Sequence, residues 1–422
     1  MEASGYVLDG MSVLDLSTFV TGGFCSLMLA NQGADVVKIE RPDAGDDIRH
    51  SGPPFVDGES PYYWSVNYDK RSVELDLKSD AGREVLYDLA SEADVFIQNY
   101  RPGTAERLGV DYDRIAAENE AIVYCAISAF GQTGPWRQRP GYDLLVQGLS
   151  GVMDVTGDPD GRPAKVGLPM TDLITGMWAA FGIVTALYRR AAIDDGVSDP
   201  EDPAARPTES AGEYIDLGML DATLPWLTKQ AGRVFAGEEP QRMGTKDPVL
   251  APYQTFRTAD GHVNVACLNR KLWRAFCGAI GREDLAEDER FATNADRVGS
   301  MDELEAEIER TLTDRPTDEW LERFLEDGVP AAPVQGIEDA LYNEQTAERD
   351  VVRTLSDGDG EREVPVVEHP LNFEHATSGF RSPPPRLDEH TREVLREAGY
   401  DEATIDRLFD CGVVGSETDA TK

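Results

Sequence analysis

The sequence predicts an α/β protein whose sheet is largely parallel. Short apolar segments rich in β-branched residues alternate with segments of helical periodicity, and this alternation is typical of strands joined by helices. The length of 422 residues is too great for one small core and indicates two or three domains. Hydrophobic residues form 41% of the chain, which is enough for an ordinary globular interior.

The expected strands lie in the first third of the chain. Five apolar segments predict them: 11–17, 35–42, 71–77, 94–103 and 121–131. A helical segment, 22–34, separates the first two, and Pro42 ends the second. Residues 78–93 have the spacing of an amphipathic helix, for which Ser79 is a plausible N-cap.

The chain changes character near residue 190. Residues 190–212 are acidic and rich in Pro and Ala, which predicts an exposed linker or loop insertion. Helical spacing resumes over 214–235, and Asp260–Gly261 predicts the turn of a β-hairpin. Two charged helices, a strand and two terminal helices are then expected over 302–328, 361–373 and 390–412.

The charge balance is strongly acidic. The chain has 79 acidic and 40 basic residues, a net charge of −39 that is spread along its whole length. We interpret this as the surface of a protein from a high-salt cytoplasm, where a Debye length of about 3 Å at 1 M salt screens mutual repulsion. Such a surface argues against nucleic acid and anionic membranes as partners, and an anionic ligand would need a local basic site.

The segments that direct a chain to a membrane or out of the cell are not expected here. From the apolar pattern we expect no run long enough to span a bilayer, and the N-terminus lacks the features of a signal peptide. Five scattered cysteines without a C-x-x-C pair predict a reducing cytoplasm and argue against a disulfide framework or zinc site: Cys25, Cys125, Cys267, Cys277 and Cys411.

Several common functional signatures are absent from the sequence. No G-x-G-x-x-G follows the first strand, and there is no P-loop and no H-E-x-x-H. The stretch "GDPDG" (157–161) lacks the spaced ligands of a calcium loop, so we expect a turn. Glu368–His369 and Glu374–His375 lie in a loop-like region, where a structural role is expected and no metal site.

A lone carboxylate, Asp172, stands near the head of an apolar helical segment, 165–190. One interpretation is an N-cap, in which Thr171 or Asp172 satisfies free backbone N–H groups. The other is a carboxylate nucleophile for an activated acyl carbon, kept ionised by the helix start. Gly167 and Gly176 would then allow a ligand to approach closely, and both interpretations can hold together.

Four stretches form a recognisable series: "GADVVKIERP" (33–42), "NYRPGTAERLG" (99–109), "AFGQTGPWRQRPGYDLLVQGLSG" (129–151) and "TDLITGMWAA" (171–180). With "APYQTFRTADGHV", "GVPAAPVQGIEDAL" and "DEHTREVLREAGY" further on, they resemble the class III CoA-transferase family, which includes formyl-CoA and carnitine CoA-transferases. The resemblance covers nearly the full chain in order. It is specific to the superfamily and much less specific to the substrate.

The resemblance implies an α/β fold with a Rossmann-like large domain and a smaller α/β domain, in a homodimer of interlocked rings. The large, CoA-binding domain would be split in sequence, over 1–205 and 331–422. A linker helix over 206–224 would lead to the small domain, 225–330.

The resemblance also implies a mechanism in which Asp172 is the catalytic residue. Asp172 would attack the acyl-CoA thioester to give a mixed anhydride, and the CoA thiolate would then form an aspartyl-CoA thioester. A carboxylic acid acceptor would reverse these steps, with coenzyme A as a substrate and no tightly bound cofactor. By resemblance to pathway types, we expect a pair of short dicarboxylic substrates, such as succinyl-CoA as donor and mesaconate as acceptor.

The family pattern further implies contacts for CoA and for the acyl group. The residues expected to contact CoA are Arg41, Leu75, Lys78, Asn99, Tyr100, Arg107 and Leu108, with Arg139 as a further candidate. The residues expected near the acyl group are Phe19, Val20, Thr21 and Tyr142. The backbone N–H of Gly244 is a further candidate, as a donor to the developing oxyanions. Asp143 matches an acidic position of some members, and no metal ligand is expected.

Three alternatives differ in class. An α-methylacyl-CoA racemase of the same superfamily would need His and Glu where this chain has Tyr142 and Asn269, neither of which exchanges protons readily near neutral pH. A dehydrogenase would need the missing glycine fingerprint. A non-catalytic CoA-binding protein would tolerate Asp172→Ala without functional change.

Overall fold

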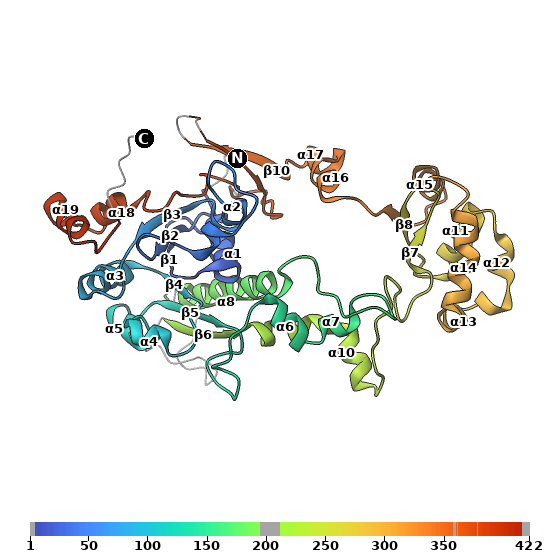
Figure 1. Ribbon diagram of the computed structural model, residues 1–422, viewed down its shortest axis with the longest axis horizontal. Helices are drawn as coiled ribbons and strands as arrows, with labels where there is room; N and C mark the ends of the chain where they lie inside the picture. The colour runs from blue at the N-terminus through green and yellow to red at the C-terminus, as the bar shows by residue number, and fades with distance from the viewer. Residues whose placement is uncertain (1–4, 195–211, 358–359, 361, 378, 416–422) are drawn as a thin grey trace. The chain divides into compact units, whose positions relative to one another are not determined.

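The computed structural model describes residues 5–194, 212–357, 360, 362–377 and 379–415. These residues form two compact units (Figure 1). The first comprises the described residues within 1–150, 167–228 and 345–422, and the second those within 151–166 and 229–344. The small domain was expected over 225–330, whereas the second unit also includes 151–166 and 331–344, and residues 225–228 belong to the first unit.

The first unit is built on a six-stranded sheet in the order β3-β2-β1-β4-β5-β6, with every neighbouring pair parallel. The strands are β1 (Ser12–Asp15), β2 (Asp35–Glu40), β3 (Lys70–Glu74), β4 (Val95–Gln98), β5 (Val123–Ser128) and β6 (Glu213–Gly218). The five strands expected from the sequence are confirmed. The order reverses between β1 and β4, and in open parallel sheets ligands bind beyond the carboxyl ends of the strands at such a point.

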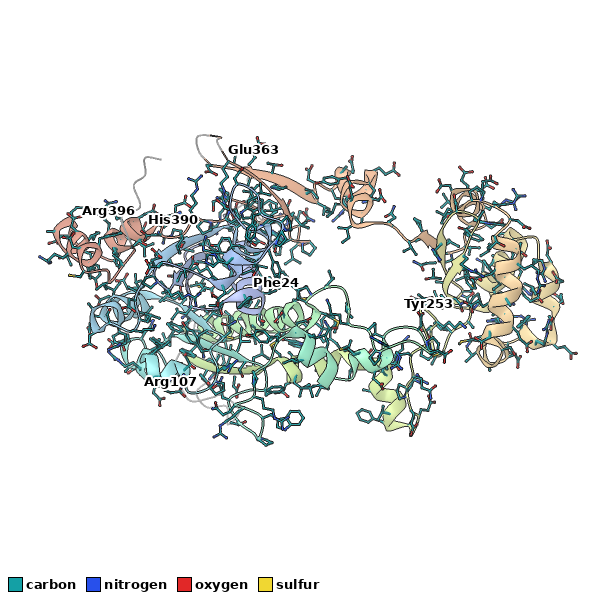
Figure 2. The ribbon with its side chains drawn as sticks, in the orientation of Figure 1. Phe24, Arg107, Tyr253, Glu363, His390 and Arg396 are labelled. Carbon is teal, nitrogen blue, oxygen red and sulfur yellow. The ribbon has the colours of Figure 1, made fainter. Side chains whose placement is uncertain are left out.

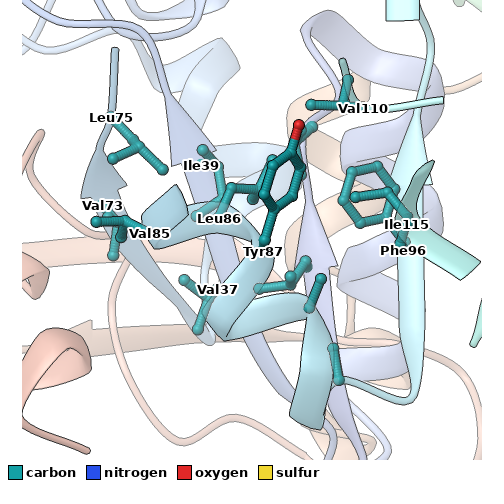
Figure 3. Close-up of a cluster of buried hydrophobic side chains, with 14 of the residues drawn as sticks. Val37, Ile39, Val73, Leu75, Val85, Leu86, Tyr87, Phe96, Val110 and Ile115 are labelled. Carbon is teal, nitrogen blue, oxygen red and sulfur yellow. The ribbon is translucent and has the colours of Figure 1, made fainter. Parts of the chain in front are cut away.

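Helices cover both faces of this sheet (Figure 1). Helix α1 (Phe19–Ala30) and helix α8 (Met170–Asp194) pack together on one face over Val13 and Cys125. The opposite face carries helices α3 (Asp80–Glu92), α5 (Tyr112–Glu118), α18 (Thr391–Glu397) and α19 (Glu402–Asp410). Figure 3 shows part of the core on that face, including Val37, Leu86 and Phe96.

Strand β6 corrects the expected helix over 214–235 and the linker helix over 206–224. Residues 213–218 form the edge strand of the parallel sheet, and 206–211 lie outside the described residues. The physical reason is the alternation of Tyr214 and Asp216 with Ile215 and Leu217, which pack into the core beneath α8. Helical structure begins only at α9 (Met219–Thr223).

Helix α8 also corrects the expectation about apolar runs. Among the described helices, Met170–Ala192 is long and apolar enough to cross a membrane by length and composition alone. Half of its most apolar window is buried within the protein. That buried half contributes Ala179, Ile183 and Leu187 to the core it shares with α1. Of the predicted loop 190–212, residues 190–194 continue α8 and 195–211 lie outside the described residues.

The second unit contains an antiparallel sheet in the order β7-β8-β9. Strands β7 (Tyr253–Arg257) and β8 (His262–Ala266) form the predicted hairpin, and β9 (Ala331–Pro333) completes the sheet. Its core packs helices α11 (Arg270–Ala279), α14 (Met301–Leu312) and α15 (Thr317–Glu326) around Trp273, Phe276 and Trp320. The stretch 157–161 forms the expected turn, with Gly161 N donating to Asp158 O at 3.0 Å.

The remaining elements are short. The strands β10 (Val352–Ser356) and β11 (Glu363–Val367) form an antiparallel hairpin. The other α-helices are α2 (Pro61–Asn67), α4 (Thr104–Leu108), α6 (Asp143–Leu149), α7 (Val152–Val155), α10 (Thr228–Phe235), α12 (Glu283–Glu287), α13 (Asn294–Gly299), α16 (Ile337–Tyr342) and α17 (Glu344–Glu348). The 3₁₀ turns are η1 (Asp47–His50), η2 (Leu224–Leu227) and η3 (Glu289–Phe291).

Candidate active site

Asp172 lies in the first turn of α8, and another carboxylate supports the start of that helix. Asp143, the first residue of α6, accepts hydrogen bonds through Oδ1 from Thr171 N at 2.9 Å and from Thr171 Oγ1 at 3.0 Å. Its Oδ2 accepts from Gln147 Nε2 at 2.7 Å. Helix α8 begins at Met170, so Thr171 and Asp172 both lie inside its first turn and the N-cap interpretation is wrong for either residue. Asp143 instead accepts the backbone N–H of Thr171 there.

Thr21 contacts Asp172 directly. Its Oγ1 donates a hydrogen bond of 2.5 Å to Asp172 Oδ1, which joins the first turn of α1 to the first turn of α8. The positive ends of both helices therefore lie near the carboxylate, which favours its anion. Gly176 permits this approach, because a Cβ there would lie 2.7 Å from the carbonyl oxygen of Thr21. Gly176 was expected to admit a ligand, whereas the structure shows that it admits helix α1.

The environment of Asp172 raises its pKa. Burial raises the pKa to about 6, with a smaller rise from the charge of Asp143, while the hydrogen bond from Thr21 lowers it. Burial and the charges of Asp172 and Asp143 also raise the pKa of Tyr62, on α2. Tyr62 therefore lies near both carboxylates. The sequence reasoning missed it, since an aromatic residue in "PYYWSVN" has the pattern of an ordinary core position.

The other residues expected near the acyl group differ in their exposure and in the unit to which they belong. Phe19 is partly exposed at the start of α1, and Tyr142 is exposed beside Asp143. Val20 is 3% exposed and its side chain packs into the core with Tyr63 and Trp64, so its expected place near the acyl group stays a prediction. Gly244 belongs to the second unit, and its role as an oxyanion donor stays a prediction.

A pocket of about 540 Å³ opens at the carboxyl ends of β1, β2 and β3. Its lining includes five of the expected CoA contacts: Arg41, Leu75, Lys78, Tyr100 and Leu108. It also includes residues that no local pattern had singled out: Ser17, Thr18, Glu40, Asp43, Asp46 and Gly412. The pocket wall therefore combines the chain that links β1 to α1 with segments from β2, β3, α4 and the residues after α19, and Thr21 follows in the first turn of α1.

The three remaining candidates lie outside the lining. Asn99 holds the backbone of Thr18, accepting from its N at 2.9 Å and donating to its O at 2.7 Å. Arg107, on α4, is exposed and donates to Gly103 O at 2.7 Å (Figure 2). Arg139 is exposed, with its guanidinium 4.5 Å from the ring centroid of Trp136. Asn99 thus fixes the backbone of Thr18, which lines the pocket, while Arg107 and Arg139 do not line it.

Two buried lysines lie beneath the pocket. Lys38 Nζ is 2.9 Å from Asp46 Oδ2, and Lys70 Nζ is 3.3 Å from Asp15 Oδ2, with all four side chains at most 1% exposed. Against the effect of burial, Lys38 and Lys70 hold the pKa of Asp15 below its ordinary value. Burial lowers the pKa of Lys70 to about 8. No local pattern marks these two lysines in the sequence, because they occupy ordinary strand positions.

This charge network fixes the start of α1. Asp46 Oδ1 accepts from Phe19 N at 3.0 Å and from Ile48 N at 3.1 Å. Phe19 has a φ of 60°, an uncommon backbone conformation for a side chain of its size. Because Lys38 pairs with Asp46, the buried ion pair holds the turn that places Thr21 two residues later.

No metal centre emerges from the residues that the structure describes. Within them there is no group of three or more His, Cys, Asp or Glu side chains that could hold an ion. Glu368 instead forms an ion pair with Arg353 at 2.7 Å, in agreement with the structural role expected for it. The five cysteines are free, four of them buried and Cys411 exposed.

Comparison with known proteins agrees with this architecture. Residues 8–391 match the model of CoA-transferase family III. The chain is 33% identical to the succinyl-CoA:glutarate CoA-transferase of Mus musculus, over 96% of this chain and 90% of the relative. It is 35% identical to the succinyl-CoA:mesaconate CoA-transferase of Haloarcula marismortui, over 94% of this chain and 98% of the relative.

A solved structure agrees as well. The crystal structure of a CaiB/BaiF family protein from Brucella suis matches with a TM-score of 0.81 at 35% identity. The match covers 94% of this chain and all of that chain. The resemblance stated from the sequence motifs is confirmed, and the chain is a CoA-transferase that belongs to CoA-transferase family III.

Proposed function

We propose that this CoA-transferase moves CoA from an acyl-CoA donor to a free carboxylic acid through covalent intermediates on Asp172. The observation that carries the proposal is the partly buried carboxylate of Asp172 at the meeting of two helix starts, one of which continues from the wall of the pocket. A carboxylate with a pKa of about 6 is mostly ionised at neutral pH, and an ionised carboxylate can attack an acyl carbon.

The proposed steps conserve the activated bond. An oxygen of Asp172 attacks the thioester carbon, the C–S bond breaks, and CoA leaves as a thiolate. The thiolate attacks the aspartyl carbon, and the donor acid leaves with the bridging oxygen. The acceptor carboxylate then attacks the aspartyl thioester and releases the thiolate, which takes the acceptor acyl group and frees Asp172. No water takes part, so the site must exclude it, and the burial around Asp172 serves this purpose.

We propose that CoA binds in the pocket at the carboxyl ends of β1, β2 and β3. The acids in its lining are balanced from beneath, Asp46 by Lys38 and Glu40 by Arg49 at 2.6 Å. Arg41 is exposed and contacts Asp47, and Lys78 is exposed beside it in the lining. These two cations suit the phosphates of CoA, since charged hydrogen bonds to phosphate are among the strongest in proteins.

Arg41→Ala and Lys78→Ala are each expected to raise the KM for the acyl-CoA donor by roughly 10-fold, the effect of losing one charged hydrogen bond. The value of kcat should change less than about 2-fold, because neither side chain contacts Asp172 in this structure. Initial rates at constant KCl measure both constants. Arg310→Ala, on an exposed face of α14, is the control. An unchanged KM in both variants would place CoA elsewhere.

We propose short dicarboxylic acids as donor and acceptor acids. The support is that two relatives carry names that specify succinyl-CoA with glutarate or mesaconate. A screen of acyl-CoA donors against free acids in high salt, on wild type and Asp172→Ala, tests this proposal and the reaction class together. Transfer to dicarboxylates should exceed transfer to monocarboxylates of equal length. Exchange of the α-hydrogen with deuterated water, without any acceptor, would indicate a racemase instead.

We propose that the protein acts as a homodimer, of the interlocked form that the family resemblance implies, in the cytoplasm of a salt-rich cell. The support is a stripe of exposed apolar side chains on α8: Met177, Phe181, Val184 and Tyr188. Their spacing of three and four residues places them on one helix face. Phe181 is 64% exposed and Tyr188 76%, which is uncommon without a partner surface. Light scattering in high salt should give twice the chain mass.

A further inference from the structure

We propose that Thr21 is a catalytic residue, whose hydroxyl stabilises the negative charge that forms on Asp172 Oδ1 when CoA thiolate attacks the aspartyl carbonyl. The inference rests on the proposed function, since Asp172 must carry the acyl group for this charge to form. Its evidence is the hydrogen bond of 2.5 Å from Thr21 Oγ1 to Asp172 Oδ1, formed by a side chain that is only 5% exposed. The donor therefore contacts a reacting atom before any substrate binds.

Because Thr21 contacts Oδ1, the two oxygens of Asp172 have different roles in the reaction. In the first step, Oδ2 attacks the donor thioester, the C–S bond breaks, and Oδ1 becomes the carbonyl oxygen of the aspartyl group. In the second step, the thiolate attacks Cγ, and the π electrons of this carbonyl move onto Oδ1. The tetrahedral intermediate collapses when the donor acid leaves with Oδ2. The hydroxyl of Thr21 keeps its hydrogen throughout, so no proton is transferred.

The hydroxyl is placed for this charge in advance. A hydrogen bond to an oxyanion is stronger than one to a carbonyl oxygen, so a donor fixed at Oδ1 favours the tetrahedral stage over the anhydride. Attack of the acceptor acid on the aspartyl thioester passes through the same stage at the same oxygen. Thr21 therefore acts twice in each turnover, whichever acid is bound.

The protein holds Thr21 from two sides. The carbonyl oxygen of Thr21 lies against Gly176, where any Cβ would come within 2.7 Å of it. On the other side, Asp46 accepts from Phe19 N and is paired with the buried Lys38. A β-branched side chain also has few rotamers, so its hydroxyl loses little freedom when it points at Asp172. Preorganisation of this kind is what an oxyanion donor requires.

Replacement of Thr21 by the nearly isosteric Val tests the proposal. We expect Thr21→Val to lower kcat by roughly 100-fold, as removal of one oxyanion donor does, with the KM for acyl-CoA unchanged. Rapid quenching with borohydride should show that aspartyl-CoA forms more slowly by the same factor. Thr21→Ser keeps the hydroxyl and should remain within about 5-fold of wild type on the same principle.

Thr175→Val is the matched control. Its buried hydroxyl donates to Thr171 O at 2.6 Å, inside the same helix as Asp172 but away from the carboxylate. It should keep the kcat of wild type. A pH profile adds a second readout, because loss of the Thr21 donor should move the acidic limb of kcat to higher pH. Asp143 and Tyr62, the other ionisable groups that face Asp172, stay in place in every variant.

The outcomes separate this inference from the function on which it rests. A folded Thr21→Val that forms aspartyl-CoA at the wild-type rate overturns the role of Thr21 alone. Equal losses in Thr21→Ser and Thr21→Val would also overturn it, since the hydroxyl would then be irrelevant. Absence of any trapped Asp172 in wild type during active exchange would instead overturn the covalent mechanism. Thermal unfolding of each variant shows which losses come from misfolding.

Discussion

Asp172→Asn is expected to lower CoA transfer by at least about 1,000-fold, the scale on which loss of a covalent nucleophile acts. The amide is close to the carboxylate in size but has no anionic oxygen for attack on the thioester. Incubation of wild type with an acyl-CoA donor, followed by borohydride or hydroxylamine, should modify Asp172, and the variant should show no modification. Transfer by the variant at the wild-type rate would exclude the mechanism.

The same substitution is expected to stabilise the fold at neutral pH. The pKa of Asp172 is raised from 3.8 to about 6, so the folded protein binds the proton more tightly than the unfolded chain. This contribution to stability is present at low pH and is lost as the pH rises through 6. A shift of this size corresponds to at most ~3 kcal/mol at pH 8, and the neutral amide avoids the cost.

Urea unfolding at constant KCl measures this effect. Asp172→Asn should gain roughly 1–3 kcal/mol over wild type at pH 8 and much less at pH 4, because the effect develops between the unfolded pKa of 3.8 and the folded pKa of about 6. Asp158→Asn, in the exposed turn of the second unit, is the control for the substitution itself. A stability difference that is the same at both pH values would contradict the raised pKa. An active-site carboxylate that is held away from water commonly lowers the stability of the fold, because activity and stability place different demands on the site.

Lys38→Met is expected to destabilise the first unit by about 3–5 kcal/mol, the cost of leaving a buried charge without its partner. Lys38 is fully buried, contacts Asp46 at 2.9 Å and donates to Ser17 O at 2.8 Å. The methionine would fill a similar volume but would leave the Asp46 carboxylate without its cationic partner. The start of α1 depends on Asp46, so transfer should fall as well.

Unfolding in urea at constant KCl measures the free energy of unfolding that Lys38→Met loses. Lys271→Met, an exposed position on α11, controls for the substitution itself and should change stability by less than about 0.5 kcal/mol. The double variant Lys38→Met/Asp46→Asn removes the unpaired charge while keeping an acceptor for Phe19 N. It should recover part of the loss. If Lys38→Met is as stable as wild type, the pair does not support the fold.

Much of the fold was predictable because its elements carry local periodicity. The five strands up to residue 128, the hairpin at Asp260–Gly261 and the terminal helices follow from apolar spacing and turn residues. Strand β6 was missed, because 213–218 is short and is followed directly by helix. The alternation of Tyr214, Ile215, Asp216 and Leu217 was its signal, and the surrounding helical pattern concealed it.

The site was predictable only in its chemistry. A lone carboxylate at the head of an apolar helix marked Asp172, and family motifs supplied five residues of the pocket wall. The support of Asp143 for the start of α8 had no local signal. The family motif also gave no sign that the side chain of Val20 packs into the core, a direction that the helical turn of about 100° per residue decides.

The sequence by itself determined the fold class and the acidic surface, because these are written in periodicity and composition, and it marked Asp172 as the residue proposed to be the nucleophile. Only the tertiary structure brought Thr21 to Asp172, 151 residues further along the chain, and paired Lys38 with Asp46 beneath the pocket. The physical reason is that the carboxyl ends of parallel strands meet at one edge of the sheet. Which side chains meet there depends on strand order and helix packing, and local patterns record neither.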